Sequence, residues 1–316
     1  MNKPQFKDRI VPINGPDDIH SLVWQFDGPL SGWTGYLNRL AGYAHSANAI
    51  RALYHACMNE GVKFYLGEQD GAVQELVYTH QNQTRRCTGL RTKNGRIHEA
   101  AVTIVAAGAY VSKLVPEAGS QIVARSWSVA HIKLTDDETS ALRGIPVTYA
   151  RDLGFFFEPD PKTNLLKLCP MGAGYVNTGT NGVSIPPDLP KESAFIPAED
   201  EEKMRKLLRQ TLPSLADRPL IDKRLCWIAD SKESDFVIDF VPGSDSSLVL
   251  LSGDSGHGFK MLPIFGKWVR DLLECGKDRQ PISRWQWKDQ TSTSTGSVSW
   301  RLGETRELVD LRPSKL

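Results

Sequence analysis

Residues 248–274, LVLLSGDSGHGFKMLPIFGKWVRDLLE, decide the fold that we predict for this chain. The apolar run Leu248–Leu251 is typical of a buried strand, and a glycine-rich loop follows at 253–258. A helix is expected next, and Gly276 should end it. Its inward residues would be Phe265, Trp268, Val269, Leu272 and Leu273. A strand, a glycine-rich loop and a helix in this order point backbone N–H groups at an anionic ligand. The glycines are spaced GxxGxG and not GxGxxG, the dinucleotide-binding pattern, so the spacing is only a weak indication of nucleotide binding.

A second set of α/β elements lies nearer the N-terminus. Ser46 should cap a helix that ends before Gly61, and a strand is expected at Val62–Leu66. The apolar face of that helix would be Ile50, Leu53, Tyr54, Cys57 and Met58. Ala101–Ala107 predicts a buried strand that turns at Gly108 into a short helix. Such a turn either binds a ligand or simply closes a core strand, and periodicity leaves both open.

The remaining pattern predicts antiparallel sheet. Residues 71–100 form a predicted β-meander with a hairpin turn at Asn94-Gly95. Strand-like pieces follow at Ile122–Ser128, Gly154–Glu158 and Leu165–Cys169. A helix over Ala198–Leu212 should bury Met204, Leu207, Leu208 and Leu212.

Composition excludes several classes of protein. Lys+Arg numbers 38 and Asp+Glu 37, so the chain lacks the charge footprint of a nucleic-acid or membrane-surface partner. No run approaches the ~20 apolar residues of a membrane span. The cysteines are widely spaced without a CxxC pair, which predicts reduced thiols in an intracellular compartment and no metal site. They are Cys57, Cys87, Cys169, Cys226 and Cys275.

The last three residues are Ser314-Lys315-Leu316. A terminal SKL is an address read by the peroxisomal import receptor. We therefore expect the protein in the peroxisome, where an enzyme that makes H2O2 would be contained.

Four longer motifs carry a family resemblance. They are LSGWTGYLNRLAGYAHS at 30–46, TIVAAGAYVSKL at 103–114, RLCWIADSKESDFVIDF at 224–240 and SGDSGHGFKMLPIFGKW at 252–268. With them the chain resembles FAD-dependent amine oxidases of the sarcosine oxidase and fructosyl amino acid oxidase (amadoriase) family, within the D-amino acid oxidase-like superfamily.

The resemblance implies an α/β fold of mixed α+β character: an incomplete FAD-binding Rossmann-like domain and a substrate domain with a mixed, largely antiparallel sheet. The implied FAD-binding segments are 29–118 and 226–280, the substrate domain 119–225, and the tail 281–316. The implied activity oxidises the C–N bond of a secondary amine to an imine and reduces O2 to H2O2. A small amine substrate, O2 and the import receptor are the expected partners.

The resemblance also implies roles for single residues. Cys226 matches the cysteine bonded through sulfur to the flavin; from RLCWIAD alone, a buried thiol would be the simpler interpretation. Lys167 matches the lysine that supports oxygen activation, the alternative being an edge-strand lysine that faces water.

The other implied site residues lie in three loops. Lys260 matches a lysine near the flavin and a substrate carboxylate. His257 matches a flavin-proximal position, the alternative being a loop histidine bonded to backbone. The remaining implied cofactor-binding residues are Gly42, Tyr43, His45, Ala107, Gly108, Gly256, Gly258 and Phe259.

Two departures from the family pattern shape the expectations. No GxGxxG is present, and about a quarter of a usual family chain is expected to be missing from the front. A non-catalytic remnant that binds little FAD, and a flavin dehydrogenase, therefore stay open as alternatives. Pro170 and Met171 replace the family's acidic pair after KxC, which favours another N-substituted amino acid, such as an N-methyl amino acid, over a sugar amine.

Overall fold

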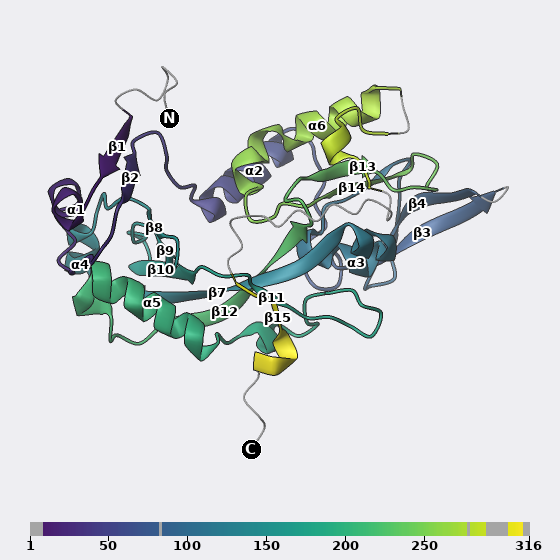
Figure 1. Cartoon of the computed structure of the whole chain (residues 1–316). Helices are drawn as coiled ribbons and strands as arrows, with labels where there is room; N and C mark the ends of the chain where they lie inside the picture. Colours follow the sequence, from purple (N-terminus) through teal and green to yellow (C-terminus); the bar gives the residue numbers. More distant parts are fainter. Residues whose placement is uncertain (1–8, 82–83, 277–278, 289–302, 312–316) are drawn as a thin grey trace.

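The computed structural model describes residues 9–81, 84–276, 279–288 and 303–311. Its elements form two groups, and the long strands β7 and β12 run from one group toward the other (Figure 1). Ser314-Lys315-Leu316 lies outside the described residues.

The first group is built on one large sheet. Within the described residues it has seven strands in the order β15-β11-β7-β10-β9-β8, and β12 pairs with the other edge of β7. All of these pairs are antiparallel except β11 with β15. The strands are β7 (Ile122–Lys133), β8 (Thr148–Ala150), β9 (Gly154–Phe156), β10 (Leu165–Pro170), β11 (Tyr175–Val176), β12 (Ile221–Ser231) and β15 (Arg306–Glu307).

Helix α5 (Ala198–Thr211) covers one face of this sheet. Glu199, Asp200 and Glu201 lie in its first turn, where negatively charged side chains interact favourably with the positive end of the helix dipole. Its residues Met204, Leu207 and Leu208 are fully buried against the alternate residues of β7 and β10. Those strand residues are Ala130, Ile132, Leu166 and Leu168. The opposite face of the sheet is therefore left for other contacts.

The second group contains two smaller sheets. One has the order β13-β14-β6, in which β14 is antiparallel to β13 and parallel to β6, so β6 is an edge strand among the described residues. The other is the meander β3-β4-β5. The strands are β3 (Val73–Gln81), β4 (Thr84–Thr92), β5 (Ile97–Glu99), β6 (Thr103–Val105), β13 (Val237–Phe240) and β14 (Leu248–Ser252). Helix α6 (Leu262–Glu274) packs Val269 against Phe236 and Ile238.

Shorter elements complete the described chain. The hairpin of β1 (Ile10–Ile13) and β2 (Gly35–Asn38) lies at the end of the molecule that carries β8 (Figure 1), and α2 (Ser46–Asn59) follows β2 in the chain. The other α-helices are α1 (Pro16–Leu22), α3 (Val111–Leu114) and α4 (Asp136–Ala141). The 3-10 turns are η2 (Gly108–Tyr110), η3 (Pro116–Ser120), η4 (Pro190–Ser193), η5 (Pro213–Leu215), η6 (Phe259–Met261), η7 (Ser283–Trp285) and η8 (Leu308–Leu311).

Most predicted elements are confirmed, including the strand, loop and helix of 248–274 and the mixed α/β fold class. The predicted strand at Val62–Leu66 is wrong: the segment is irregular and exposed, because it pairs with no strand of the described chain. His45 caps α2 in place of Ser46, since its Nδ1 accepts from the Asn48 N–H at 3.4 Å. The predicted boundary between residues 225 and 226 falls within β12, which continues to Ser231.

The apolar faces predicted for α2 and α6 are not fully buried. Every residue of α2 is at least partly exposed, including Ile50, Leu53 and Met58 of its apolar face. In α6, the inward position predicted for Leu273 is wrong, because Leu273 is exposed, whereas Val269 and Leu272 are buried as predicted. A helical apolar stripe becomes a core face only where another element covers it.

Candidate functional site

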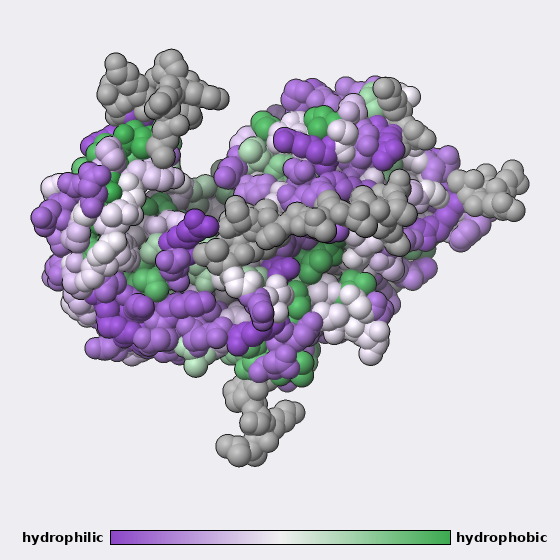
Figure 2. Space-filling view, in the orientation of Figure 1, coloured by the Kyte–Doolittle hydropathy of each residue, from purple (hydrophilic) through white to green (hydrophobic). Residues whose placement is uncertain are grey.

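The face of the large sheet opposite α5 carries the predicted reactive side chains. Directly opposed residues of paired strands point to the same face. Lys167 of β10 opposes His131 of β7, and Cys226 of β12 opposes Trp127 of β7. His131 and Trp127 are four residues apart on one strand and so share its face. Cys226 and Lys167 are therefore brought to one surface. Figure 2 shows a notch between the part of the molecule that carries β1 and β2 and the part that carries α2 and α6.

Lys167 is partly buried on an interior strand, because β10 pairs with both β7 and β9. The alternative of an edge-strand lysine facing water is thus wrong. The Nζ of Lys167 lies 5.7 Å from the centroid of the Phe157 ring. Burial, with Arg224 and Lys167 nearby, lowers the pKa of His131, so His131 is neutral at neutral pH and the local positive charge belongs to the lysine and the arginine.

The two cysteines of this face differ in exposure. The Cys226 thiol is exposed, which makes the simpler interpretation of a buried thiol wrong. Cys169, two residues after Lys167, is buried, and burial raises its pKa to about 12. Cys169 is therefore a neutral thiol inside the sheet, and Cys226 is the one that a ligand can reach.

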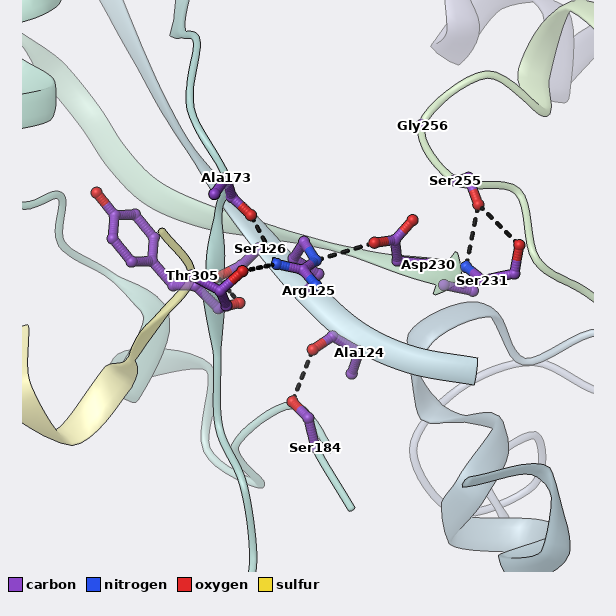
Figure 3. Close-up of polar contacts among 12 residues, drawn as sticks. Ala124, Arg125, Ser126, Ala173, Ser184, Asp230, Ser231, Ser255, Gly256 and Thr305 are labelled. Atoms are coloured by element: carbon purple, nitrogen blue, oxygen red, sulfur yellow. Dashed lines mark hydrogen bonds and ion pairs between the residues drawn. The ribbon is translucent and has the colours of Figure 1, made fainter. Parts of the chain in front are cut away.

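The loop after β14 is fixed to the end of β12. The Ser255 N–H donates to the Ala229 carbonyl at 2.9 Å, and the Ala229 N–H donates to Asp254 Oδ1 at 2.9 Å. The Ser231 N–H donates to Ser255 Oγ at 3.1 Å (Figure 3). Gly256 has φ +77°, which favours glycine, and a Cβ there would lie 3.5 Å from Ile228 Cδ1. These bonds keep the loop beside the strand that carries Cys226.

The remaining residues of this loop, 257–260, differ in their contacts and in their exposure. His257 Nε2 lies 2.8 Å from the Ser234 carbonyl oxygen and its ring packs on Phe236, as expected of a loop histidine bonded to backbone. Gly258 is buried, with the Cβ of Asp254 2.8 Å from where its own would stand. Phe259 and Lys260 are exposed in η6. The role predicted for Lys260 stays a prediction.

Tyr43 and His45 contact residues that follow β9. The Tyr43 hydroxyl donates to Glu158 Oε2 at 3.2 Å, and its ring centroid lies 5.7 Å from that of Phe157. His45 Nε2 lies 3.6 Å from Asp160 Oδ2. Phe157 is thus a common neighbour of Tyr43 and Lys167. Gly42, at the start of this segment, is exposed.

The turn after β6 also lies beside the long strands. Ala107 and Gly108 are partly exposed, and η2, which begins at Gly108, runs close to β12 and β7. Gly108 has φ +55° with open space where a Cβ would stand. The backbone can therefore be approached closely at this turn, which is the property that a ligand-binding turn requires.

Sequence reasoning missed the buried ion pair of Arg125 with Asp230. Arg125 Nε donates to Asp230 Oδ2 at 2.9 Å, and Nη1 donates to the Ala173 carbonyl at 2.7 Å and to Thr305 (Figure 3). The pair joins β7, β12 and the residues before β15, close to the Ser231–Ser255 contact. Arg125 and Trp127 alternate along the strand predicted at Ile122–Ser128, and that spacing was the available signal.

Two kinds of site are absent from the described ranges. They contain no group of three or more His, Cys, Asp or Glu side chains arranged to hold a metal ion. Within the same ranges, no helix has the length and apolar character that crossing a bilayer requires.

Comparison with known proteins gives one consistent result. The family model described as FAD dependent oxidoreductase matches residues 20–272. The L-saccharopine oxidase of Schizosaccharomyces pombe is 32% identical over 290 residues, which are 88% of this chain and 65% of the relative. An N-methyl-L-tryptophan oxidase of Salmonella typhimurium is 29% identical over 186 residues, which are 58% of this chain and 46% of the relative.

A solved structure agrees with these matches. The fructosamine oxidase Amadoriase II of Aspergillus fumigatus superposes with a TM-score of 0.85 at 31% identity, over 98% of this chain and 72% of that one. The chain thus spans 65% of the length of the saccharopine oxidase that it matches.

Proposed function

The chain belongs to the FAD dependent oxidoreductase family, and we propose that it is an amine oxidase that acts on the C–N bond of a secondary amine. The reaction removes two electrons and two hydrogens from the amine to give an imine, which water hydrolyses, and reduces O2 to H2O2. The observation that best supports this proposal is that a partly buried Lys167 and an exposed Cys226 share the open face of the large sheet.

The residues of this face fit a flavin ring. The Cys226 thiol is exposed, and the positive-φ glycines Gly108 and Gly256 allow close approach of a flat group. When bound, FAD supplies the electron acceptor and the reaction with O2. Cys226 would hold it through sulfur. The residues around it would be Gly42, Tyr43, His45, Ala107, Gly108, Gly256, His257, Gly258, Phe259 and Lys260.

Lys167 has the properties of an electrostatic catalyst in this proposal. Its strand is fixed on both sides, and its Nζ lies over the Phe157 ring, so the cation is held in place before any charge develops. A preorganised positive charge stabilises the negative charge that forms as oxygen is reduced. Arg224 on the same face would add to the attraction of a substrate carboxylate.

We infer that the substrate is an N-substituted amino acid of the saccharopine kind. The saccharopine oxidase match supports this, as do the cations Lys167 and Arg224 on the open face, which suit a substrate with several carboxylates. Met171 and Pro170, which are uncharged and buried, offer no carboxylate to a sugar hydroxyl.

The experiment begins with the colour of the purified protein. A yellow protein that produces H2O2 with L-saccharopine, and less with sarcosine, N-methyl-L-tryptophan or fructosyl-glycine, is the expected result. Reduction of an artificial dye without O2 consumption would indicate a dehydrogenase instead. A colourless protein that binds no added FAD would contradict the proposal and support the remnant.

The Lys167→Met variant tests the oxidase mechanism. Because Lys167 acts on the oxygen half of the reaction, reoxidation of the reduced protein by O2 should slow by about 10²–10³-fold. Anaerobic reduction by substrate should change much less. Lys133→Met is the matched control, since Lys133 is exposed on the neighbouring strand and donates to the Thr163 carbonyl. Equal losses in both half-reactions would make Lys167 structural.

We also propose a peroxisomal location, supported by Ser314-Lys315-Leu316 at the end of the chain. The import receptor would then be a partner, and the H2O2 product would be formed in a compartment that contains it.

A further inference from the structure

A cavity of about 370 Å³ lies beside the open face, and the proposed reaction gives no role to the charged residues that line it. This volume falls within the range of small-molecule sites. Its lining combines aromatic, charged and small residues. They are Trp127, Pro170, Met171, Gly172, Ala173, Gly174, Tyr175, Glu199, Asp200, Lys203, Gly303, Glu304 and Arg306.

The cavity lies where the pairing of β7 passes from β10 to β11. β10 pairs with β7 as far as Ala130, and β11 pairs with β7 at Ser126 and Arg125. Residues 171–174 connect the two strands. Trp127 Nε1 donates to the Gly172 carbonyl at 3.0 Å, and Arg125 holds Ala173 and Thr305 (Figure 3). The walls are thus fixed by side chains of β7.

The charges that line the cavity come in adjacent pairs of opposite sign. The Asp200 side chain is only 5% exposed, and its Oδ2 accepts from Ser128 Oγ at 2.5 Å. Lys203 Nζ lies 4.0 Å from Asp200 Oδ1 and donates to the Met171 carbonyl at 3.1 Å. Arg306 pairs with Glu199, which also accepts from the Tyr175 hydroxyl at 3.2 Å.

This arrangement discriminates among ligand charges. A purely anionic ligand would meet the carboxylates of Glu199, Asp200 and Glu304, and a purely cationic one would meet Lys203 and Arg306. A group that carries an ammonium and a carboxylate on one carbon can oppose both signs at once. Trp127, Tyr175 and Met171 supply apolar surface for a methylene chain attached to it.

We propose that this cavity binds an α-amino acid group, the distal end of the amine substrate, with its ammonium toward Asp200 and its carboxylate toward Lys203. Trp127 connects the cavity to the reaction, because it lines the cavity and directly opposes Cys226 in the sheet. The cavity's assignment to a substrate arm rests on the proposed function, whereas its amino acid specificity rests on the lining alone.

Calorimetric titration with L-norleucine tests the inference without turnover, because this amino acid has an alkyl chain and no further charge. Hexanoate and 1-aminopentane each lack one of its charged groups and should bind at least tenfold more weakly. Asp200→Asn and Lys203→Met should each raise the Kd for L-norleucine at least tenfold. Lys206→Met is the control on the same helix, where Lys206 is exposed, and should not change it. Thermal melts establish that each variant is folded.

The outcomes separate the two proposals. Absence of binding at millimolar L-norleucine, or equal binding by the parent, Lys203→Met and both singly charged probes, would overturn the inference. If Asp200→Asn does not fold, the Kd of Lys203→Met alone tests the inference. Lys203 is partly exposed, so its replacement should leave the fold intact. Binding with the expected pattern in a protein that oxidises no amine would uphold the cavity and refute the proposed function. Amine oxidation without L-norleucine binding would uphold the proposed function and refute the assignment of the cavity.

Discussion

Cys226 and Cys169 show how position within a sheet controls the chemistry of one residue type. Both lie on the sheet face that carries Lys167, but Cys169 is buried between β7 and β9 while Cys226 is exposed on β12. Burial disfavours the thiolate of Cys169 and raises its pKa. Only the exposed thiol can form a bond to a ligand, which makes Cys226 the residue to test.

Replacing Cys226 with alanine should release the flavin. If the tether is at Cys226, trichloroacetic acid should leave flavin in the pellet of the parent protein and extract nearly all of it from Cys226→Ala. Absorbance of the two fractions measures the effect. Cys57→Ala, on α2, is the control and should behave like the parent. Equal extraction from the parent and Cys226→Ala would disprove the tether.

At the scale of elements, Glu138 of helix α4 takes part both in the cap of its own helix and in an ion pair with a distant residue. Thr135 and Glu138 form a capping box at its N-terminus, with the Glu138 N–H donating to Thr135 Oγ1 at 3.2 Å. Glu138 also pairs with Arg218, 80 residues further along the chain. The Arg218 hydrogen bond is the main cause that lowers the pKa of Glu138 from 4.5 to about 2.

This lowered pKa predicts a pH dependence of stability. Because the folded-state pKa is below the ordinary value, the contribution of Glu138 is complete above pH 4.5 and disappears as pH falls toward about 2. Glu138→Gln should therefore cost about 1 kcal/mol at pH 7, after allowance for solvent screening, and almost nothing at pH 2. Urea titrations at both pH values measure the difference. Asp137→Asn, in the same first turn, is the control, and a cost that does not depend on pH would contradict the ion pair.

Helices α5 and α2 have apolar stripes of similar spacing and different surroundings. The stripe of α5 is buried on the large sheet, and Met204, Leu207 and Leu208 have no exposed surface. In α2, Ile50 is 49% exposed and Leu53 is 44% exposed. The residues that follow α2, including Phe64 and Leu66, are also exposed, and so is Ile104 on the edge strand β6. Apolar side chains are therefore exposed on α2, on 62–66 and on β6.

At the scale of the whole molecule, this uncovered surface predicts self-association. Exposed apolar patches and free strand edges promote contact between copies. The chain should form oligomers or aggregates whose size rises with concentration, and Ile50→Lys with Leu53→Glu should at least double the monomer fraction. Size-exclusion chromatography with light scattering measures it. Arg51→Gln, on the same helix, is the control, and a parent that is monomeric at all concentrations would contradict the prediction.

The proposed location is a property of the whole chain and its receptor. Deleting Ser314-Lys315-Leu316 should move a fluorescently tagged protein from peroxisomes to the cytosol without a change in melting temperature, because terminal residues contribute little to stability. The tag must be at the N-terminus, since a C-terminal tag would hide the address. Peroxisomal fluorescence that persists after the deletion would refute the prediction.

The amino-acid sequence by itself determined the local elements and the family. The alternation along 122–128 and the stripe of Met204, Leu207 and Leu208 predicted a strand and a helix correctly, because burial repeats with the period of the element. Cys226 and Lys167 were selected by family resemblance, since a thiol or an ammonium group carries no sign of its role in its own sequence.

Only the tertiary structure decided which side chains meet. Trp127 opposes Cys226 because of the register of β7 and β12, and Arg125 reaches Asp230 across the same pair. The strand predicted at 62–66 did not form, because a strand requires hydrogen bonds from a neighbour that sequence spacing does not reveal. The cavity lies where the pairing of β7 passes from β10 to β11, which is a matter of register between distant segments. Register and partner choice depend on contacts between distant segments, whereas sequence periodicity reports each element alone.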